Sequence, residues 1–106
     1  MFARIVKSNL KPNHTADFNE AIEKQILPLL RKAKGFQDQI TFAGPSGTEM
    51  VSISIWDRKE NAESYNSETY PEVLKALASV IEGIPQVKTY EVTSSTFQKF
   101  APHATV

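Results

Sequence analysis

The stretch TEMVSISIW, residues 48–56, constrains the fold of this chain more than any other segment. It is rich in β-branched and aromatic residues that alternate with small polar ones, which predicts a β-strand. Successive side chains of a strand lie on opposite faces of its sheet. One face carries Val51, Ile53 and Ile55, and the other carries Met50, Ser52, Ser54 and Trp56. Because both sets are largely apolar, neither face of the sheet is expected to remain in water.

The other predicted elements complete a β-α-β-β-α-β order. Strands are expected at about 2–9, 36–43, 48–56 and 86–97, with GPSG at 44–47 as a hairpin turn. Helices are expected at about 15–34, 58–66 and 69–82, the last two being pieces of one helical run. With the second and third strands as a hairpin and both helical runs on one face, this is the ferredoxin-like α+β arrangement.

Capping and helix-breaking residues set the predicted limits of the first helix. Thr15 or Asn13 can cap its first turn. Pro28 lacks a backbone N–H and is expected to bend the helix, and Gly35 suits the position just after its end.

Similar signals bound the second helical run. Asp57 with Glu60 three residues later has the spacing of a capping box. Ser67 or Thr69 can cap the second piece, Gly83 can end it, and Pro85 prevents its continuation.

Two helical runs on one face leave the other face of the sheet uncovered. That face is apolar whichever side of the third strand it presents, as described above. We therefore expect a second copy of the chain to cover it, giving a homodimer joined through the sheet faces.

Composition narrows the class of protein. The chain has 106 residues, which predicts one domain over 1–97 followed by a tail at 98–106 that contains His103. It has 12 basic and 12 acidic residues and no basic stripe, so neither nucleic acid nor a membrane surface is an expected partner. No signal peptide or membrane-spanning stretch is evident, and we expect a cytoplasmic protein.

Several catalytic classes lack their motifs. The sequence has no cysteine, no Gly-rich phosphate loop, no H-E-x-x-H and no G-x-S-x-G. Its two histidines, His14 and His103, have neither metal-ligand spacing nor a neighbouring carboxylate cluster, so no metal site is predicted.

Four stretches together are similar to one known family. They are KGF at 34–36, VSISIWDRKENAESY at 51–65, YPEVLKAL at 70–77 and IPQVKTYEVTSSTF at 84–97. From about Phe2 to Phe97 the chain resembles the antibiotic-biosynthesis-monooxygenase (quinol-monooxygenase-like) family of dimeric α+β barrels. The resemblance implies a homodimer with a ligand pocket between helices and sheet in each subunit. It also implies that some members oxidise quinols or polycyclic aromatics with O2 and without metal or flavin.

Other members of that family degrade haem. They use an asparagine of the first strand, a tryptophan of the second helix and a histidine further along. Asn9 matches the first position, but the other two fall at Tyr65 and near Lys75, with no histidine between His14 and His103. The sequence departs from this subgroup, and we expect no cofactor.

Two polar residues are candidate catalytic groups. His14 lies in the loop before the first helix, where an imidazole could act as a general base and remove a phenolic proton. Asn9, at the end of the first strand, can donate a hydrogen bond to a developing oxyanion. A solvated loop histidine and a turn asparagine are the simpler interpretations.

The candidate substrate-binding residues are aromatic or apolar. Trp56 either packs in the core or stacks against a flat ligand at the hinge between strand and helix. The other predicted pocket walls are Tyr65, Phe42, Phe18, Tyr70 and Leu74.

The sequence-based hypothesis is a small cofactor-independent monooxygenase that oxidises a quinol-like or phenolic aromatic with O2. The alternative is a non-catalytic dimeric protein that binds a small apolar or aromatic molecule or serves a stress-related role. A pocket of several hundred Å³ with convergent polar groups would favour the enzyme. A third possibility, an isomerase or cyclase, would need an acid–base pair that the sequence does not provide.

Overall fold

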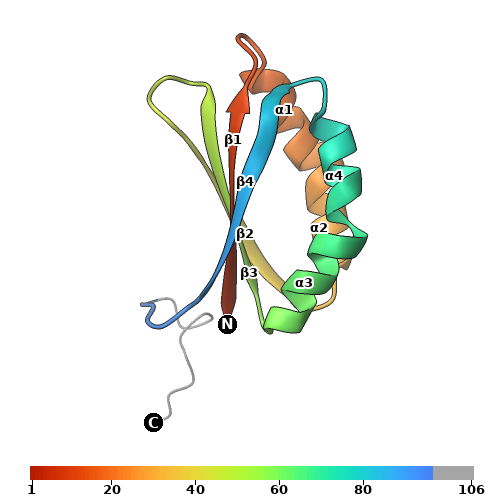
Figure 1. Ribbon diagram of the computed structural model, residues 1–106, viewed down its shortest axis with the longest axis vertical. Helices are drawn as coiled ribbons and strands as arrows, with labels where there is room; N and C mark the ends of the chain where they lie inside the picture. Colours follow the sequence, from red (N-terminus) through yellow and green to blue (C-terminus); the bar gives the residue numbers. More distant parts are fainter. Residues whose placement is uncertain (97–106) are drawn as a thin grey trace.

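The computed structural model describes residues 1–96, which form one sheet with helices along it (Figure 1). The strands are β1 (Phe2–Leu10), β2 (Phe36–Ala43), β3 (Glu49–Trp56) and β4 (Ile81–Glu91). The first helical run comprises α1 (Thr15–Ala21), the π-helix η1 (Ile22–Ile26) and α2 (Leu27–Lys32). The second comprises α3 (Lys59–Glu68) and α4 (Tyr70–Leu77).

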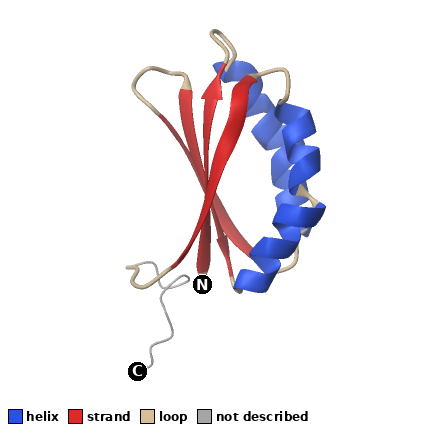
Figure 2. Ribbon diagram, in the orientation of Figure 1, coloured by secondary structure: helices blue, strands red, loops and turns tan. Residues whose placement is uncertain are grey.

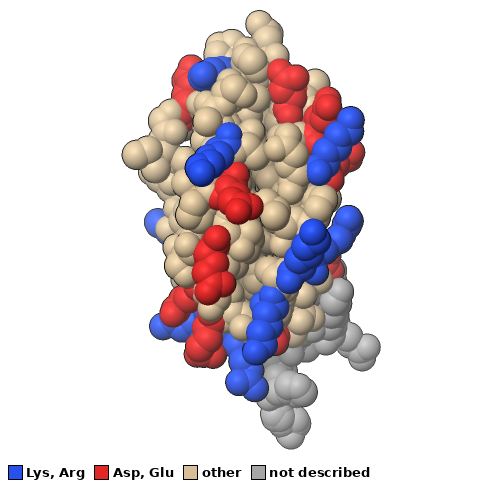
Figure 3. Space-filling view, turned by 90° about the vertical axis from the view of Figure 1, so that its right-hand side faces the viewer, with Lys and Arg blue, Asp and Glu red and all other residues tan. Residues whose placement is uncertain are grey.

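The sheet has the order β2-β3-β1-β4, and all its neighbouring strands are antiparallel. Both helical runs lie against one face, and the other face has no helix over it (Figure 2). The predicted ferredoxin-like βαββαβ fold is therefore confirmed. On the helical side, acidic and basic side chains are interspersed (Figure 3). None of the helices within residues 1–96 is long and apolar enough to cross a membrane.

Strand β3 shows which of its two apolar sets faces the helices. Met50, Ser54 and Trp56 are buried against the helices, and Trp56 has 0% of its surface exposed. The opposite set faces the uncovered side, where Ile53 pairs with Ile5 of β1 and with Ile40 of β2. The branched residues of β3 therefore form the centre of the open face.

The first helical run contains a wider turn just before Pro28. The Leu27 N–H donates to the Ile22 carbonyl, five residues back, which defines a π-helical turn. A proline cannot donate to the carbonyl four residues back and its ring crowds that group, so an α-helical turn is unfavourable there. The predicted disturbance at Pro28 is confirmed, and its form is a π-turn.

The predicted caps of the first helix are wrong. His14 holds the N-cap position and makes no side-chain capping bond. Asn13 has a φ of 65°, outside the range of a helix cap. The Thr15 hydroxyl instead donates to the Gly47 carbonyl at 3.0 Å, which ties the start of α1 to the β2–β3 hairpin.

The predicted limits of the second helical run need three corrections. Arg58, not Asp57, is the N-cap of α3, and the Asp57 carboxylate accepts a bond from the Asn61 amide at 2.8 Å. Thr69 precedes α4 as predicted, but α4 ends at Leu77. Gly83, with a φ of 68°, does not end a helix. It lies in β4, where Glu82 pairs with Asn9 and Gln86 pairs with Lys7. The three residues between Glu82 and Gln86 therefore lie opposite a single residue of β1. This irregularity leaves Ile84 91% exposed.

Strand β4 starts and ends earlier than predicted. It begins at Ile81 and ends at Glu91, and the Val92 N–H then donates to the Met1 carbonyl at 3.0 Å. The predicted domain limit at Phe97, the tail at 98–106 and His103 all lie outside the described residues.

Gly35 provides a test of the connection between α2 and β2. It has a φ of 82°, and a side chain there would collide with Asp57 and Asn61. Gly47 has a similar φ of 78°, but a Cβ added there would meet no atom within 4 Å. Gly47→Ala should lower the free energy of unfolding by about 1–2 kcal/mol, the cost of a left-handed backbone. Gly35→Ala should lower it further in urea titrations. Equal losses would contradict this account of the connection.

Candidate functional site

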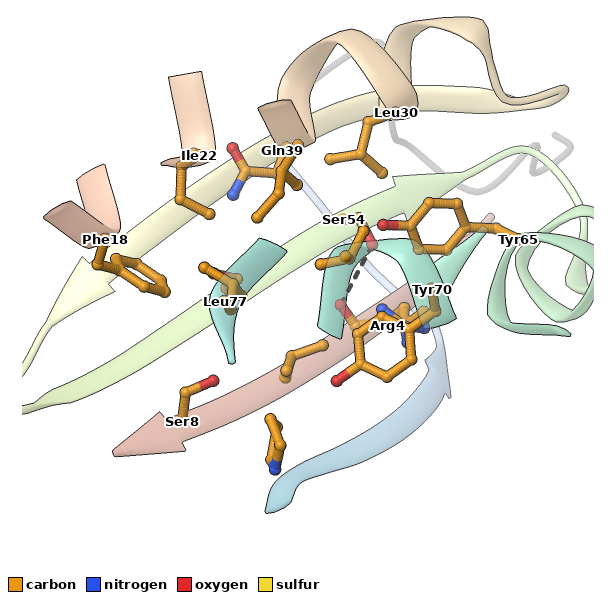
Figure 4. A pocket seen from close by; sticks show the side chains of 15 residues that line it. Arg4, Ser8, Phe18, Ile22, Leu30, Gln39, Ser54, Tyr65, Tyr70 and Leu77 are labelled. Atoms are coloured by element: carbon orange, nitrogen blue, oxygen red, sulfur yellow. Dashed lines mark hydrogen bonds between the residues drawn. The ribbon is translucent and has the colours of Figure 1, made fainter. Parts of the chain in front are cut away.

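A cavity of about 50 Å³ lies between the helices and the sheet. Its apolar wall comes mostly from the helices and consists of Phe18, Ile22, Ile26, Leu30, Val73 and Leu77. Its polar lining comes from β1, β2, β3 and the α3–α4 junction and includes Arg4, Ser8, Gln39, Ser54, Tyr65 and Tyr70. Arg4, Tyr65 and Tyr70 gather at one end, while Phe18, Ser8 and Leu77 lie towards the other (Figure 4).

Arg4 supplies the positive charge in this cavity. It is only 3% exposed because its position on β1, between Phe2 and Val6, faces the helices. Its Cζ atom lies 4.2 Å from the centre of the Tyr70 ring and 5.1 Å from that of Tyr65, so the cation contacts two aromatic faces. An Nη atom donates to the Asn66 side-chain oxygen at 2.8 Å.

Two donors at this end of the cavity lack acceptors. Among residues 1–96, no group accepts a hydrogen bond from Arg4 Nε, and the Tyr70 hydroxyl has no hydrogen-bond partner. The guanidinium is close enough to the Tyr70 hydroxyl to influence its pKa, but no hydrogen bond of ordinary geometry joins the two groups. A buried donor without an acceptor lowers the stability of the fold. A bound ligand or a water molecule that accepts these hydrogen bonds would remove this cost.

Burial changes the protonation equilibria of all three side chains. Burial lowers the pKa of Arg4, and the two tyrosines oppose this shift. Burial raises the pKa of Tyr65 to about 12, although the Arg4 cation beside it acts in the opposite direction. Burial also raises the pKa of Tyr70, again against the effect of Arg4. Both tyrosines therefore keep their hydroxyl protons at neutral pH.

The break between α3 and α4 brings the two tyrosines together around Arg4. On one continuous α-helix, residues five apart point about 140° away from each other. The chain leaves the helix at Thr69, between Tyr65 in the last turns of α3 and Tyr70 at the start of α4. This junction therefore allows both rings to face the same guanidinium.

Trp56 lies behind the cavity and does not line it. Its indole N–H donates to the Ser54 hydroxyl at 2.9 Å, and its ring contacts Phe36 and Tyr65 at centroid distances of 5.7 and 5.0 Å. The simpler interpretation, a core tryptophan, therefore fits the structure. Through Ser54 and Tyr65, Trp56 supports two residues of the cavity wall.

The structure brings only three of the predicted substrate-binding residues into the cavity: Phe18, Tyr65 and Tyr70. Leu74 is half-buried and does not line the cavity, since Val73 and Leu77 occupy that face of α4. Phe42 lies on the open face of the sheet, 49% exposed, because it pairs with Val51 on that side. Phe42 therefore contributes nothing to this cavity.

Neither predicted catalytic group lines the cavity. His14 precedes α1, where its Nδ1 lies 3.0 Å from the Asp17 carboxylate. Asn9 is exposed and alternates along β1 with Ser8, whose side chain does line the cavity. A catalytic role for either residue stays a prediction.

Arg4, the residue with the most distinctive environment, is not among the site residues predicted from the sequence. The signal was available in the alternation of β1, where Phe2, Val6 and Leu10 share a face with Arg4. An arginine on the apolar side of a strand indicates a buried charge. Ser54 could have been found in the same way, on the face of β3 that Met50 and Trp56 mark.

The high pKa of Tyr65 predicts the pH dependence of stability. The folded chain holds this proton more tightly than the unfolded chain, whose tyrosines titrate near pH ~10. The resulting stabilisation is complete below pH ~10 and is lost as the pH rises through the folded pKa of about 12. In an absorbance titration of folded protein, Tyr65→Phe should remove a late ionisation step that Tyr90→Phe leaves unchanged. Identical curves for the two variants would contradict the assignment.

Comparison with known proteins identifies the fold. No protein-family model matches the sequence, and no curated protein is significantly similar to it. Among solved structures, a candidate antibiotic biosynthesis monooxygenase from Bordetella bronchiseptica superposes with a TM-score of 0.74 at 19% identity. The alignment covers 86% of this chain and 95% of that one.

Two similar structures are described by their chemistry. SnoaB of Streptomyces nogalater, a cofactor-independent oxygenase, has a TM-score of 0.74 at 10% identity, over 92% of this chain and 97% of its own. The monooxygenase from the ActVA-Orf6 gene of Streptomyces coelicolor, solved with nanaomycin D, has a TM-score of 0.71 at 17% identity, over 99% and 89%. The chain thus has the α+β fold of the antibiotic biosynthesis monooxygenase proteins, as the resemblance in its sequence implied.

Proposed function

We propose that the chain is a cofactor-independent monooxygenase of a small quinol-like or phenolic aromatic. The observation that carries this proposal is the buried Arg4 cation beside two protonated tyrosines in a cavity whose helical wall is apolar. The oxygenase descriptions of SnoaB and of the ActVA-Orf6 product support the same class of chemistry on this fold.

The reaction needs no electron donor besides its substrate. When a quinol reacts with O2, one oxygen atom converts a ring C–H to C–OH. The two hydroxyl hydrogens leave with the other oxygen atom as water, and the product is a hydroxyquinone. The reaction starts when the substrate loses a hydroxyl proton, because the resulting anion is electron-rich enough to transfer electrons to O2.

Arg4 and Tyr70 have properties suited to that first step. A cation close to a bound hydroxyl lowers its pKa, so the anion forms at a lower pH. The two unpartnered donors, Arg4 Nε and the Tyr70 hydroxyl, can both donate to the developing oxyanion. The apolar wall keeps water from the reactive anion.

The size of the cavity limits the substrate. An engineered cavity of about 150 Å³ admits benzene, whereas this cavity measures about 50 Å³. Even a single ring must therefore displace side chains on entry, and a polycyclic ring system would need a larger rearrangement. We propose a monocyclic substrate for this reason.

The small cavity also supports the second candidate function, a non-catalytic binding protein. The cavity of about 50 Å³ is far smaller than the several hundred Å³ that would favour an enzyme, and the fully buried Trp56 packs behind Ser54. Both candidates use the same cavity, and they differ in whether O2 is consumed.

Oxygen consumption by purified, chelator-treated protein with monocyclic quinols decides between them. We expect protein-dependent uptake, with Arg4→Met and Tyr70→Phe lowering kcat/KM by roughly 10- to 100-fold, the effect of losing a hydrogen bond to a charged group. Lys75→Met, which removes an exposed charge from α4, is the control. His14→Ala and Asn9→Ala test the two residues predicted from the sequence. Uptake no faster than autoxidation across the panel would favour the binding protein.

We also propose that the open sheet face joins two copies of the chain. Ile40, Phe42 and Tyr90 are about half exposed there, beside Val51, Ile53 and Ile55. A hollow of about 130 Å³ on the same face, lined by Ile5, Lys7, Gln86, Lys88 and Tyr90, would be covered by the second copy. Apolar surface of this extent is uncommon on a monomer.

Light scattering tests the dimer. The wild-type chain should have the mass of two copies at micromolar concentration. Phe42→Glu should shift the equilibrium towards one copy, because it places a charge in the apolar contact. Lys75→Glu, on the helical side, should leave the mass unchanged. A monomeric wild-type chain would contradict the proposal.

A further inference from the structure

We propose that the cavity binds a small carboxylate, anchored by the Arg4 guanidinium. The inference concerns binding and does not depend on oxygen chemistry. It rests on a buried cation that, among residues 1–96, has neither an ion-pair partner nor enough acceptors for its donors.

Arg4 has no ion-pair partner among residues 1–96. Within residues 1–96, the ion pairs join His14 to Asp17, Lys24 to Glu20 and Lys59 to Glu63, and none of them includes Arg4. None of the side chains that line the cavity is acidic. Residues 97–106, FQKFAPHATV, contain no Asp or Glu. Neither an ion pair within residues 1–96 nor an acidic residue of the cavity wall therefore neutralises this cation.

The donors around this cation outnumber their acceptors among the described residues. The one hydrogen-bond acceptor of Arg4 in the described chain is the neutral amide oxygen of Asn66. Its Nε–H and the Tyr70 O–H remain without acceptors, and the guanidinium lies against the Tyr70 ring. A carboxylate has two oxygens that each accept hydrogen bonds, and a guanidinium edge presents two parallel donors to them. One carboxylate could thus satisfy both Nε–H and the tyrosine.

The charge and the walls of the cavity favour one class of anion. The cavity offers one cation, so a monoanion would be neutralised, whereas phosphate would bring a second negative charge. The wall that the helices form is apolar, with Ile22, Leu30 and Val73 among its residues, and suits the hydrocarbon part of an organic acid. The volume of about 50 Å³ restricts the acid to a small one unless side chains move.

A carboxylate bound in this way would occupy Arg4 Nε–H and the Tyr70 hydroxyl, the same donors that the proposed monooxygenase directs at the oxyanion of its substrate. The two proposals are therefore different uses of one pair of donors. The carboxylate proposal can nevertheless succeed or fail alone, because its test measures binding and involves no turnover.

The experiment is a calorimetric titration of the full chain with two acids and their neutral amides. Formate and benzoate are the acids, and formamide and benzamide are the controls of matched size, all at constant ionic strength. Formate fits the cavity as it stands, so a negative result with it cannot be attributed to ligand size. We expect saturable binding of formate, benzoate or both, and none of either amide.

Four variants locate the binding. Arg4→Met should weaken binding by about tenfold or more, and Arg4→Lys, which keeps the charge without the fork, should give an intermediate loss. Tyr70→Phe should weaken it several-fold, and Lys75→Met should leave it unchanged. Thermal unfolding of each variant supplies a second readout, since it separates a loss of binding from a loss of folding. If Arg4→Met does not fold, Arg4→Lys and Tyr70→Phe decide.

Three results would overturn the proposal: no binding of either acid up to millimolar concentrations, equal binding of acids and amides, or equal losses in the Arg4 and Lys75 variants. Carboxylate binding without oxygen uptake would support this inference and reject the monooxygenase. Oxygen uptake from neutral quinols without carboxylate binding would do the reverse.

Discussion

The burial of one positive charge organises the centre of this molecule. A guanidinium inside a protein needs hydrogen-bond acceptors and aromatic faces around it, because it has lost its hydration. Arg4 obtains them from the end of α3 and the start of α4, through Tyr65, Asn66 and Tyr70. These contacts join the central strand to the second helical run, and Trp56 supports them from behind through Tyr65. The same contacts leave the Nε–H of the guanidinium without an acceptor among residues 1–96, so the cavity presents a charged donor to a ligand.

Strand β1 gives the two faces of the sheet different properties. Arg4, Val6 and Ser8 line the cavity, while Ile5 and Lys7 line the hollow on the opposite side. A ligand and a second copy of the chain would therefore meet different residues of one strand. Binding at one face need not disturb the other, since the strand backbone lies between them. This separation allows the dimer and the cavity to be tested with independent variants.

The sequence allowed the fold to be predicted because its main signals are local. Alternation in β3, apolar stripes in the helices and the turns at 44–47 fixed the element order, and the structure agrees with it. Gly83 and Pro85 were misinterpreted, because a glycine and a proline that end a helix look the same in sequence as a pair in an irregular strand. Their true setting depends on the pairing of β4 with β1, a long-range contact.

The site was predicted less well than the fold, for a different reason. Phe42 and Trp56 are aromatic, but the face on which each lies depends on strand pairing and on what covers that face. Phe42 lies on the open side, and Trp56 is buried behind the cavity. The alternation of β1 indicated that Arg4 is buried, but what surrounds this charge depends on contacts with distant residues. Among residues 1–96, the structure shows two aromatic rings and one amide oxygen around it and no ion pair.

The π-helical turn has a geometric consequence for the helical wall of the cavity. Phe18 and Leu30, twelve residues apart, would point about 120° apart on a regular α-helix, at about 100° per residue. The wider turn of η1 accommodates one additional residue and reduces this angle to about 20°. Both side chains can therefore line one cavity. It follows that this helical run could lose one residue at the turn and keep the same inward-facing side chains. The loss of one residue from β1 would instead exchange its two faces and expose the arginine.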